Sequence, residues 1–160
     1  MAKVMLICGK IGSGKTQYAK SFINTLPAVL LSVDEITLAL FGQNAGEHHD
    51  FIVEKTEQYL FAKSLEMIKA GMHVILDWGF WTHEERKAAT AFYKQNDVAV
   101  EWHYMNVSDG KLRENLNKRN REVEKGQTLF YLFDDNFANQ FWNMFEIPDK
   151  NEIDVWVTVE

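Results

Sequence analysis

Residues 9–16 have the types and spacing of a phosphate-binding loop. They read G-K-I-G-S-G-K-T and match the pattern G-x-x-x-x-G-K-[ST] at every fixed position. Such a loop must carry little side-chain bulk, because successive backbone amides turn inward around a polyphosphate. Lys15 would bring positive charge to the β- and γ-phosphates, and Thr16 would place a hydroxyl on Mg²⁺. We expect these loop residues to bind the nucleotide: Gly9, Gly12, Ser13, Gly14, Lys15 and Thr16.

The surroundings of this loop fit a nucleotide site. An apolar run precedes it and an amphipathic pattern begins at Lys15, so a strand, the loop and a helix follow one another. The helix would turn the positive end of its dipole toward the anion. Residues 117–120 read N-K-R-N, which superficially resembles the guanine motif N-K-x-D but lacks its aspartate. The sequence therefore favours ATP over GTP, with Mg²⁺ as its companion.

Two acids follow apolar runs that are typical of strands. Asp34 comes after residues 29–33 and Asp77 comes after residues 74–76. Ligands of parallel sheets bind at the carboxyl ends of the strands, which is also where the phosphate loop lies. We expect Asp77 to hold Mg²⁺ together with Thr16, and Asp34 to act as general base toward an attacking hydroxyl. Glu35 competes for the role of base, and either aspartate could instead only cap the following helix.

A local excess of positive charge lies between Lys111 and Lys125, with six basic residues against three glutamates. Phosphoryl transfer needs cations that close over the triphosphate and stabilise its spreading charge. Arg119 and Arg121 suit a lid of this kind over residues 108–127, with Arg119 also contacting the nucleotide. A solvated helix face with internal ion pairs would explain the same pattern.

Short apolar runs alternate with long amphipathic stretches, which predicts an α/β fold with a parallel sheet covered on both faces. We expect strands at Lys3–Cys8, Ala28–Val33, His73–Asp77, Val98–Tyr104 and Ile153–Val159. We expect helices at about Lys15–Thr25, Glu35–Leu40, Asp50–Ala70, His83–Gln95, Asp109–Asn120 and Asp134–Phe145. The architecture is then a three-layer α/β/α sandwich with a five-stranded parallel sheet and a small helical lid. Residues 1–160 are expected to form a single domain.

Helix boundaries can be predicted from capping chemistry as well as from periodicity. Thr82 with Glu85 has the spacing of a capping box. Gly71 suits the left-handed position that follows a helix. Ser108 and Asp134 are expected N-caps.

Taken together, these motifs resemble the small P-loop kinases, a group that includes polynucleotide 5′-hydroxyl kinase-like, chloramphenicol phosphotransferase-like and zeta-toxin-like proteins, often labelled AAA-family ATPases. The resemblance covers nearly the whole chain and rests on these features: the loop at 9–16, Ser32-Val33-Asp34, the strand ending at Asp77, Arg86, Leu116-x-x-Arg119-Asn120 and Phe145-Glu146-x-Pro148.

The resemblance implies the P-loop NTPase fold and particular roles. Asp34 matches the family's base toward the acceptor hydroxyl, and Arg119 matches its lid arginine, with Arg121 as a second candidate. The loop at 145–148 would lie by the adenine. A true AAA+ motor would need a second helical domain, for which a chain of 160 residues is expected to have no room.

Two segments are expected to flank an acceptor pocket, because both follow the strand-end acids: Phe41–Asp50 and Trp78–Trp81. Trp78, Phe80 and Trp81 could stack a base or an aromatic substrate, or could simply pack. His48 and His49 could ligate a metal or relay a proton, or could be solvated. Arg86 could bind an acceptor phosphate, or pair with Glu85 or Asp77.

Composition narrows the class of partner. The formal charge is −6, which argues against general nucleic-acid binding. The lone cysteine, Cys8, excludes an intramolecular disulfide framework. The first apolar run is too short to span a membrane or to act as a secretion signal, so a cytoplasmic protein without a membrane partner is expected.

The sequence thus predicts an ATP-dependent phosphotransferase that moves the γ-phosphate of ATP to an unidentified hydroxyl acceptor. The acceptor would be a small molecule, and nucleic acid is expected only as a 5′-end substrate. Two alternatives stay open: a nucleotide-binding switch that acts through a protein partner, and a nucleoside monophosphate kinase. The second would need arginines devoted to the acceptor phosphate, and apart from Arg86 the sequence shows little of such a set.

Overall fold

The fold is built around one sheet of five strands, all pairing in parallel, in the order β2-β3-β1-β4-β5. The computed structural model describes all 160 residues. The strands are β1 (Val4–Gly9), β2 (Ala28–Leu31), β3 (His73–Gly79), β4 (Val100–Val107) and β5 (Val155–Val159). The predicted five-stranded parallel sheet is therefore confirmed.

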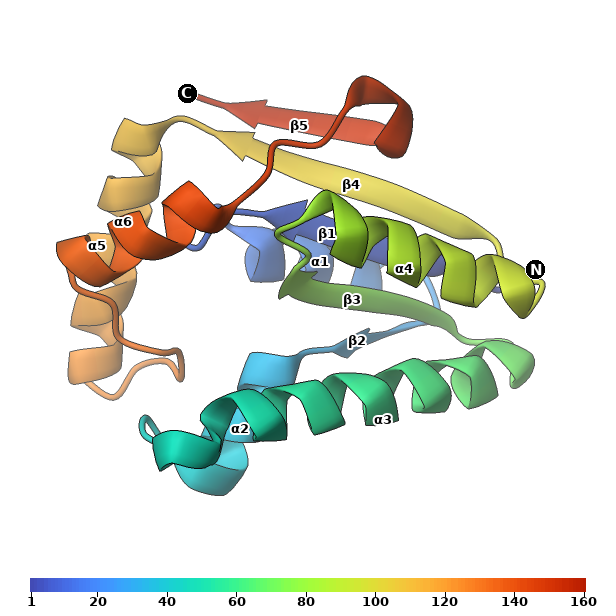
Figure 1. The fold of residues 1–160 in the computed structure, drawn as a ribbon, viewed down its shortest axis with the longest axis horizontal. Helices are drawn as coiled ribbons and strands as arrows, with labels where there is room; N and C mark the ends of the chain where they lie inside the picture. Colours follow the sequence, from blue (N-terminus) through green and yellow to red (C-terminus); the bar gives the residue numbers. More distant parts are fainter.

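The helices are α1 (Lys15–Ile23), α2 (Val33–Phe41), α3 (His49–Lys69), α4 (His83–Gln95), α5 (Asp109–Glu124) and α6 (Asp135–Met144), with short 3₁₀ turns η1 (Gly46–His48) and η2 (Lys150–Glu152). Figure 1 shows α3 and α4 on one face of the sheet and α1 on the other. Helices α5 and α6 stand beyond the carboxyl ends of β1 and β4. None of these helices combines the length and the apolar character needed to cross a bilayer.

The central strand explains why the sheet is covered on both faces. All six residues of β1 are buried, so both of its faces meet apolar side chains. Val4, Leu6 and Cys8 pack into the larger core beneath α3 and α4, whereas Met5 and Ile7 pack against α1. A third, smaller core joins α5 to α6.

The predicted caps are confirmed. The Thr82 hydroxyl and the Glu85 carboxylate form a reciprocal capping box at the start of α4. Ser108 and Asp134 accept backbone N–H groups at the starts of α5 and α6. Gly71 follows α3 with a φ of 89°, as expected for the left-handed residue after a helix.

One predicted boundary was wrong in a way that matters for the site. Strand β2 ends at Leu31 and α2 already begins at Val33, because the Ser32 hydroxyl caps the helix by accepting the N–H of Glu35 at 3.3 Å. Asp34 therefore lies in the first turn of a helix and not directly at the end of a strand. Helix α5 also continues past the predicted end at Asn120, to Glu124.

Candidate active site

The loop at residues 9–16 joins β1 to α1, and its glycines are required by backbone geometry. Gly12 and Gly14 have φ angles of 85° and 84°, in the left-handed region that favours glycine. A Cβ on Gly9 would lie only 2.7 Å from the Ser13 hydroxyl oxygen. The loop can therefore keep this tight wrap only with glycine at these positions.

Two side chains from α5 and α6 brace the loop from outside. The Asn115 amide donates to the Gly12 carbonyl at 2.9 Å, and the Trp142 indole donates to the Ile11 carbonyl at 2.9 Å. Neither residue is recognisable from the sequence as part of the site, because no local pattern connects α5 or α6 to a loop more than 100 residues away. These bonds hold the loop against α5, which belongs to the predicted lid, and against α6.

Lys15 is the first residue of α1, and its side chain reaches back over the loop. Its ammonium group donates to the carbonyls of Gly9 and Lys10 at 3.0 Å each. Burial lowers the pKa of Lys15 from 10.5 to about 8, and the nearby charges of Asp77 and Asp34 oppose that shift. The cation is therefore close to both predicted acids.

Asp77 lies on β3 and is only 6% exposed. Burial raises the pKa of its carboxyl group from 3.8 to about 6, while the Thr16 hydroxyl and Lys15 favour the charged form. Its Oδ2 atom is buried without a hydrogen-bond partner, as is the Ser13 hydroxyl. A buried unpaired carboxylate oxygen beside a threonine hydroxyl is a suitable ligand pair for a hard divalent cation.

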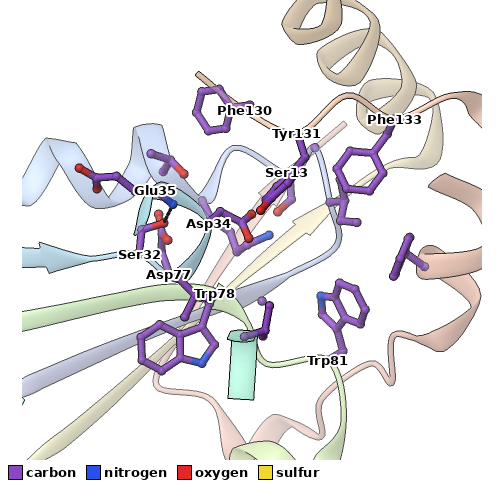
Figure 2. A pocket seen from close by; sticks show the side chains of 18 of the residues that line it. Ser13, Ser32, Asp34, Glu35, Asp77, Trp78, Trp81, Phe130, Tyr131 and Phe133 are labelled. Atoms are coloured by element: carbon purple, nitrogen blue, oxygen red, sulfur yellow. Dashed lines mark hydrogen bonds between the residues drawn. The ribbon is translucent and has the colours of Figure 1, made fainter. Parts of the chain in front are cut away.

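Asp34 faces the cavity from α2 and is open to its solvent, with protein walls on most sides. This partial burial raises the pKa of Asp34 above its usual value, whereas Lys15, Arg119 and His49 favour the charged form. Glu35 also lines the cavity, and only its backbone N–H, not its carboxylate, takes part in the Ser32 cap. Figure 2 shows Asp34 close to Asp77 at the middle of the site.

The two predicted lid arginines have different positions. Arg119 lines the cavity, and its guanidinium carbon lies 4.9 Å from the centre of the Phe130 ring. Its buried Nε has no hydrogen-bond partner. Arg121 is exposed and does not line the cavity. The structure thus brings Arg119 to the other site residues and leaves Arg121 outside.

Residues 128–133, which we call the aromatic loop, cover the site beyond the predicted limit of the lid. The Gln43 amide group bonds the carbonyl of Phe130 at 2.7 Å and the N–H of Leu132 at 3.1 Å. The hydroxyls of Tyr131 and Thr37 are 2.7 Å apart. Figure 2 shows this loop on one side of Asp34, and Trp78 and Trp81 on the opposite side.

The aromatic loop was not predicted as part of the site, although its composition carries a signal for burial. The run F-Y-L-F at 130–133 is too apolar for a solvated linker between two helices. Asn120 binds both the carbonyl and the N–H of Phe133, at 2.6 and 3.3 Å. The loop is therefore tied at one end to α5 and at the other to α2.

The turn after β3 places aromatic side chains along the cavity, as predicted. Gly79 has a φ of 90° and the following Phe80 a φ of 49°, so this turn holds a non-glycine residue in a strained conformation. Phe80 is 4% exposed and packs against Trp102. Trp78 and Trp81 are half-buried and line the cavity. Packing therefore explains Phe80, and the two tryptophans remain available to a ligand.

Arg86 lies outside the site. It is 2% exposed, and its guanidinium donates to Glu152 at 3.0 Å, to the Phe80 carbonyl at 2.8 Å and to the Glu146 carbonyl at 3.0 Å. It pairs with neither of the predicted acids, because α4 turns it toward the segment before β5. No residue of 145–148 lines the cavity, and Glu146 instead donates its N–H to the Trp81 carbonyl.

His48 and His49, the two histidines that the sequence singled out, have different surroundings. His48 is exposed and lies near Glu47, whereas His49 lines the cavity, with its ring 5.7 Å from that of Tyr131.

The cavity that these side chains line has a volume of about 1490 Å³. It lies at the carboxyl ends of the strands, next to β1, whose neighbours in the sheet are β3 and β4.

A glycine-rich loop between β1 and α1 at this edge of a parallel sheet defines the P-loop NTPase fold. The sequence matches the AAA domain family AAA_33 over residues 4–129, which is more than half of the chain. The chain therefore belongs to this family. A search of the curated proteins gave no match.

Solved structures share the fold at low sequence identity. Kti12 of Chaetomium thermophilum in complex with ADP-AlF3 superposes with a TM-score of 0.72, at 15% identity over 98% of this chain and 88% of that one. The Mycobacterium tuberculosis APS kinase CysC in complex with AMPPNP and APS superposes with a TM-score of 0.67. The identity is 14%, over 98% of this chain and 88% of that one. A chain of the Pnkp1/Rnl/Hen1 RNA repair complex superposes with a TM-score of 0.73 at 18% identity. The match covers 89% of this chain but only 43% of that one.

Proposed function

We propose that the protein is an ATP-dependent phosphotransferase that transfers the γ-phosphate of ATP to a hydroxyl group. The observation that carries this proposal is the convergence of Lys15, Asp34, Asp77 and Arg119 on one cavity. A phosphate loop, a buried acid beside its threonine, a second acid open to the cavity and an arginine over it are the parts that phosphoryl transfer needs. The fold shared with APS kinase and with Kti12 bound to ADP-AlF3 supports this assignment.

In this proposal the loop of residues 9–16 binds the phosphates of ATP through its amides and Lys15. The acceptor oxygen forms a bond to the γ-phosphorus while the bond from that phosphorus to the β,γ-bridging oxygen breaks, and ADP leaves. The hydroxyl proton passes to the carboxylate of Asp34. Lys15 and Arg119 neutralise charge on the transferring group.

Mg²⁺ fits the residues present. The unpaired Oδ2 of Asp77 and the hydroxyl of Thr16 would hold it, because carboxylate and hydroxyl oxygens are its preferred protein ligands. When bound, the ion would neutralise charge on the β- and γ-phosphates. The positive charge of the ion would also favour the ionised form of Asp77, against the effect of burial, which raises the pKa of this carboxyl group.

We further propose that residues 1–160 act as one unit, in which α5 and the aromatic loop form the lid. Lid closure would bring Arg119 onto the phosphates, since this arginine already lies between the loop and Asp34. Arg121 has no role in this mechanism. The lid is thus longer than residues 108–127 and includes the segment to Phe133.

The assignment of the base is tested by comparing Asp34→Asn with Glu35→Gln. Removing a general base reduces turnover by about 10²–10⁴-fold, so Asp34→Asn should lower kcat by this amount and leave ATP binding intact. Glu35→Gln should keep kcat within about threefold, because its carboxylate is one position further round the helix. Transfer of labelled γ-phosphate from ATP to a panel of alcohols measures both. Full transfer by Asp34→Asn would show that the base is elsewhere.

A further inference from the structure

Helices α3 and α4 line one part of the cavity, which we call the acceptor groove. Each helix contributes one stripe, because residues three or four apart share a helix face. The α3 stripe consists of His49, Val53, Glu57 and Phe61. The α4 stripe consists of Glu85, Ala88, Ala89 and Phe92. The groove is continuous with the part of the cavity that holds Asp34 and Asp77.

Aromatic side chains form part of the groove's lining. The Phe61 ring lies 5.3 Å from the ring of Trp78 and 5.3 Å from that of Phe92, measured between centroids. All three side chains are only partly buried, so some of their surface faces the groove. A flat or apolar ligand body can therefore be covered here without any change in the core.

Charge is divided unequally within the cavity. Its lysines and arginine all come from α1 and α5: Lys15, Lys20, Lys118 and Arg119. The stripes of α3 and α4 contain no lysine or arginine, and they hold Glu57 and Glu85. An anionic acceptor would meet these carboxylates with no cation to offset them.

The two glutamates are not equivalent. Glu85 is committed to the capping box, where its Oε2 accepts the N–H groups of Trp81 at 2.7 Å and Thr82 at 3.2 Å. Glu57 has no comparable partner. Burial, with the charges of Glu85 on α4 and Glu54 on α3, raises the pKa of Glu57 from 4.5 to about 7. A half-buried carboxylate that has no hydrogen-bond partner and shares a cavity with aromatic side chains is suited to a cation.

Resting on the phosphotransferase proposed above, we propose that the acceptor is a small amino alcohol whose ammonium group binds at Glu57 and whose apolar body lies against Trp78 and Phe61. Its hydroxyl would point toward Asp34, and its amine would stay protonated through the transfer. The reaction is the one already described, with ATP as the phosphate donor and ADP as the leaving product. Glu57 is a specificity residue here and does not touch the reacting atoms.

Three probes that share a ring and a hydroxyl but differ in charge test this proposal: phenylethanolamine, styrene glycol and mandelate. Calorimetry with AMPPNP and Mg²⁺ at pH 8 measures binding without turnover, and labelled ATP measures transfer separately. We expect phenylethanolamine to bind at least tenfold more tightly than styrene glycol, and mandelate to bind most weakly. Equal affinities, a reversed order, or no binding by any probe would overturn the proposal.

Glu57→Gln should lower the affinity for phenylethanolamine, relative to that for styrene glycol, by about tenfold. It should leave the KM for ATP unchanged. Glu54→Gln is the matched control, because it lies three residues earlier on α3 and does not line the cavity. If both variants had the same effect, the loss of one negative charge on α3 would explain it without a specific role for Glu57, and the proposal would be contradicted. Glu57-dependent binding without transfer to any alcohol would instead count against the phosphotransferase, whereas transfer that prefers neutral or anionic alcohols would count only against the amino alcohol.

Discussion

At the scale of single residues, the site keeps several polar groups without partners. The Ser13 hydroxyl, Oδ2 of Asp77 and Nε of Arg119 are all buried and unpaired. Such groups reduce stability, because their lost hydration is not replaced. They come from a loop, a strand and a helix that are far apart in the sequence, yet they meet at one cavity. A shared polar ligand would satisfy all of them.

Glu57 gives a prediction about pH. Its folded-state pKa is about 7 against 4.5 in the unfolded chain, so the folded protein holds an extra proton between these values and loses stability as the pH rises through this range. Glu57→Gln has no such penalty and should be more stable than the wild type at pH 8, by about 1–3 kcal/mol. At pH 4.5 the two should be nearly equal. Urea unfolding at both pH values measures this, and an advantage that is the same at both would contradict it.

At the scale of elements, the aromatic loop is held by contacts that different helices contribute. Gln43 and Thr37 bind it beside α2, and Asn120 binds it from α5. A loop that is tied at both ends can close as a unit when its hydrogen bonds form together. Opening of the site is therefore expected to require that the contacts to the α2 side break while those to α5 persist.

Tyr131→Phe tests this description of the loop. The change removes one hydrogen bond to Thr37, which stabilises the docked loop by about 1 kcal/mol, and keeps the ring against His49. Amide hydrogen exchange in residues 128–133 should become about fivefold faster, with little change in global stability. The exposed Tyr59 on α3 offers Tyr59→Phe as the control. Unchanged exchange in Tyr131→Phe would show that this bond does not hold the loop.

At the scale of the whole molecule, Arg86 connects parts of the chain that the sheet does not join. It binds Glu152 in η2, the carbonyl of Phe80 after β3 and the carbonyl of Glu146 after α6. The turn that carries Trp78 and Trp81 is thereby fastened to the segment leading into the edge strand β5. The strained φ of Phe80 persists because this surrounding structure fixes it.

Arg86→Ala should therefore lower the free energy of unfolding by about 2–4 kcal/mol, because it leaves the Phe80 and Glu146 carbonyls without their donor and removes the partner of the partly exposed Glu152. Arg86→Lys should restore little of it, since an ammonium group cannot reach three separated acceptors in a fixed fork. The neighbouring exposed Lys87 provides the control variant Lys87→Ala. Urea denaturation gives the comparison. Loss of acceptor binding at unchanged stability would instead favour the phosphate-binding role that the sequence left open.

Much of the fold followed from local chemistry. The strand at Val4–Gly9, the caps at Thr82, Ser108 and Asp134 and the phosphate loop depend on neighbouring residues, and all were predictable. The end of β2 was not, because Ser32 could equally have extended the strand or capped the helix. Sequence patterns identified Lys15 through the phosphate-loop motif, and Asp34 and Asp77 through their place after apolar runs, and the structure brings all three to the same cavity.

The sequence by itself determined the order of strands and helices and the identity of the phosphate loop, since periodicity, capping and backbone freedom act over a few residues. Only the tertiary structure shows that Arg119 lines the cavity and Arg121 does not, because which face of α5 meets the cavity depends on how that helix packs on α6 and on the phosphate loop. The same holds for the aromatic loop and the acceptor groove. Glu57 and Glu85 are 28 residues apart in the chain, and only the packing of α3 and α4 on one face of the sheet brings their charges together.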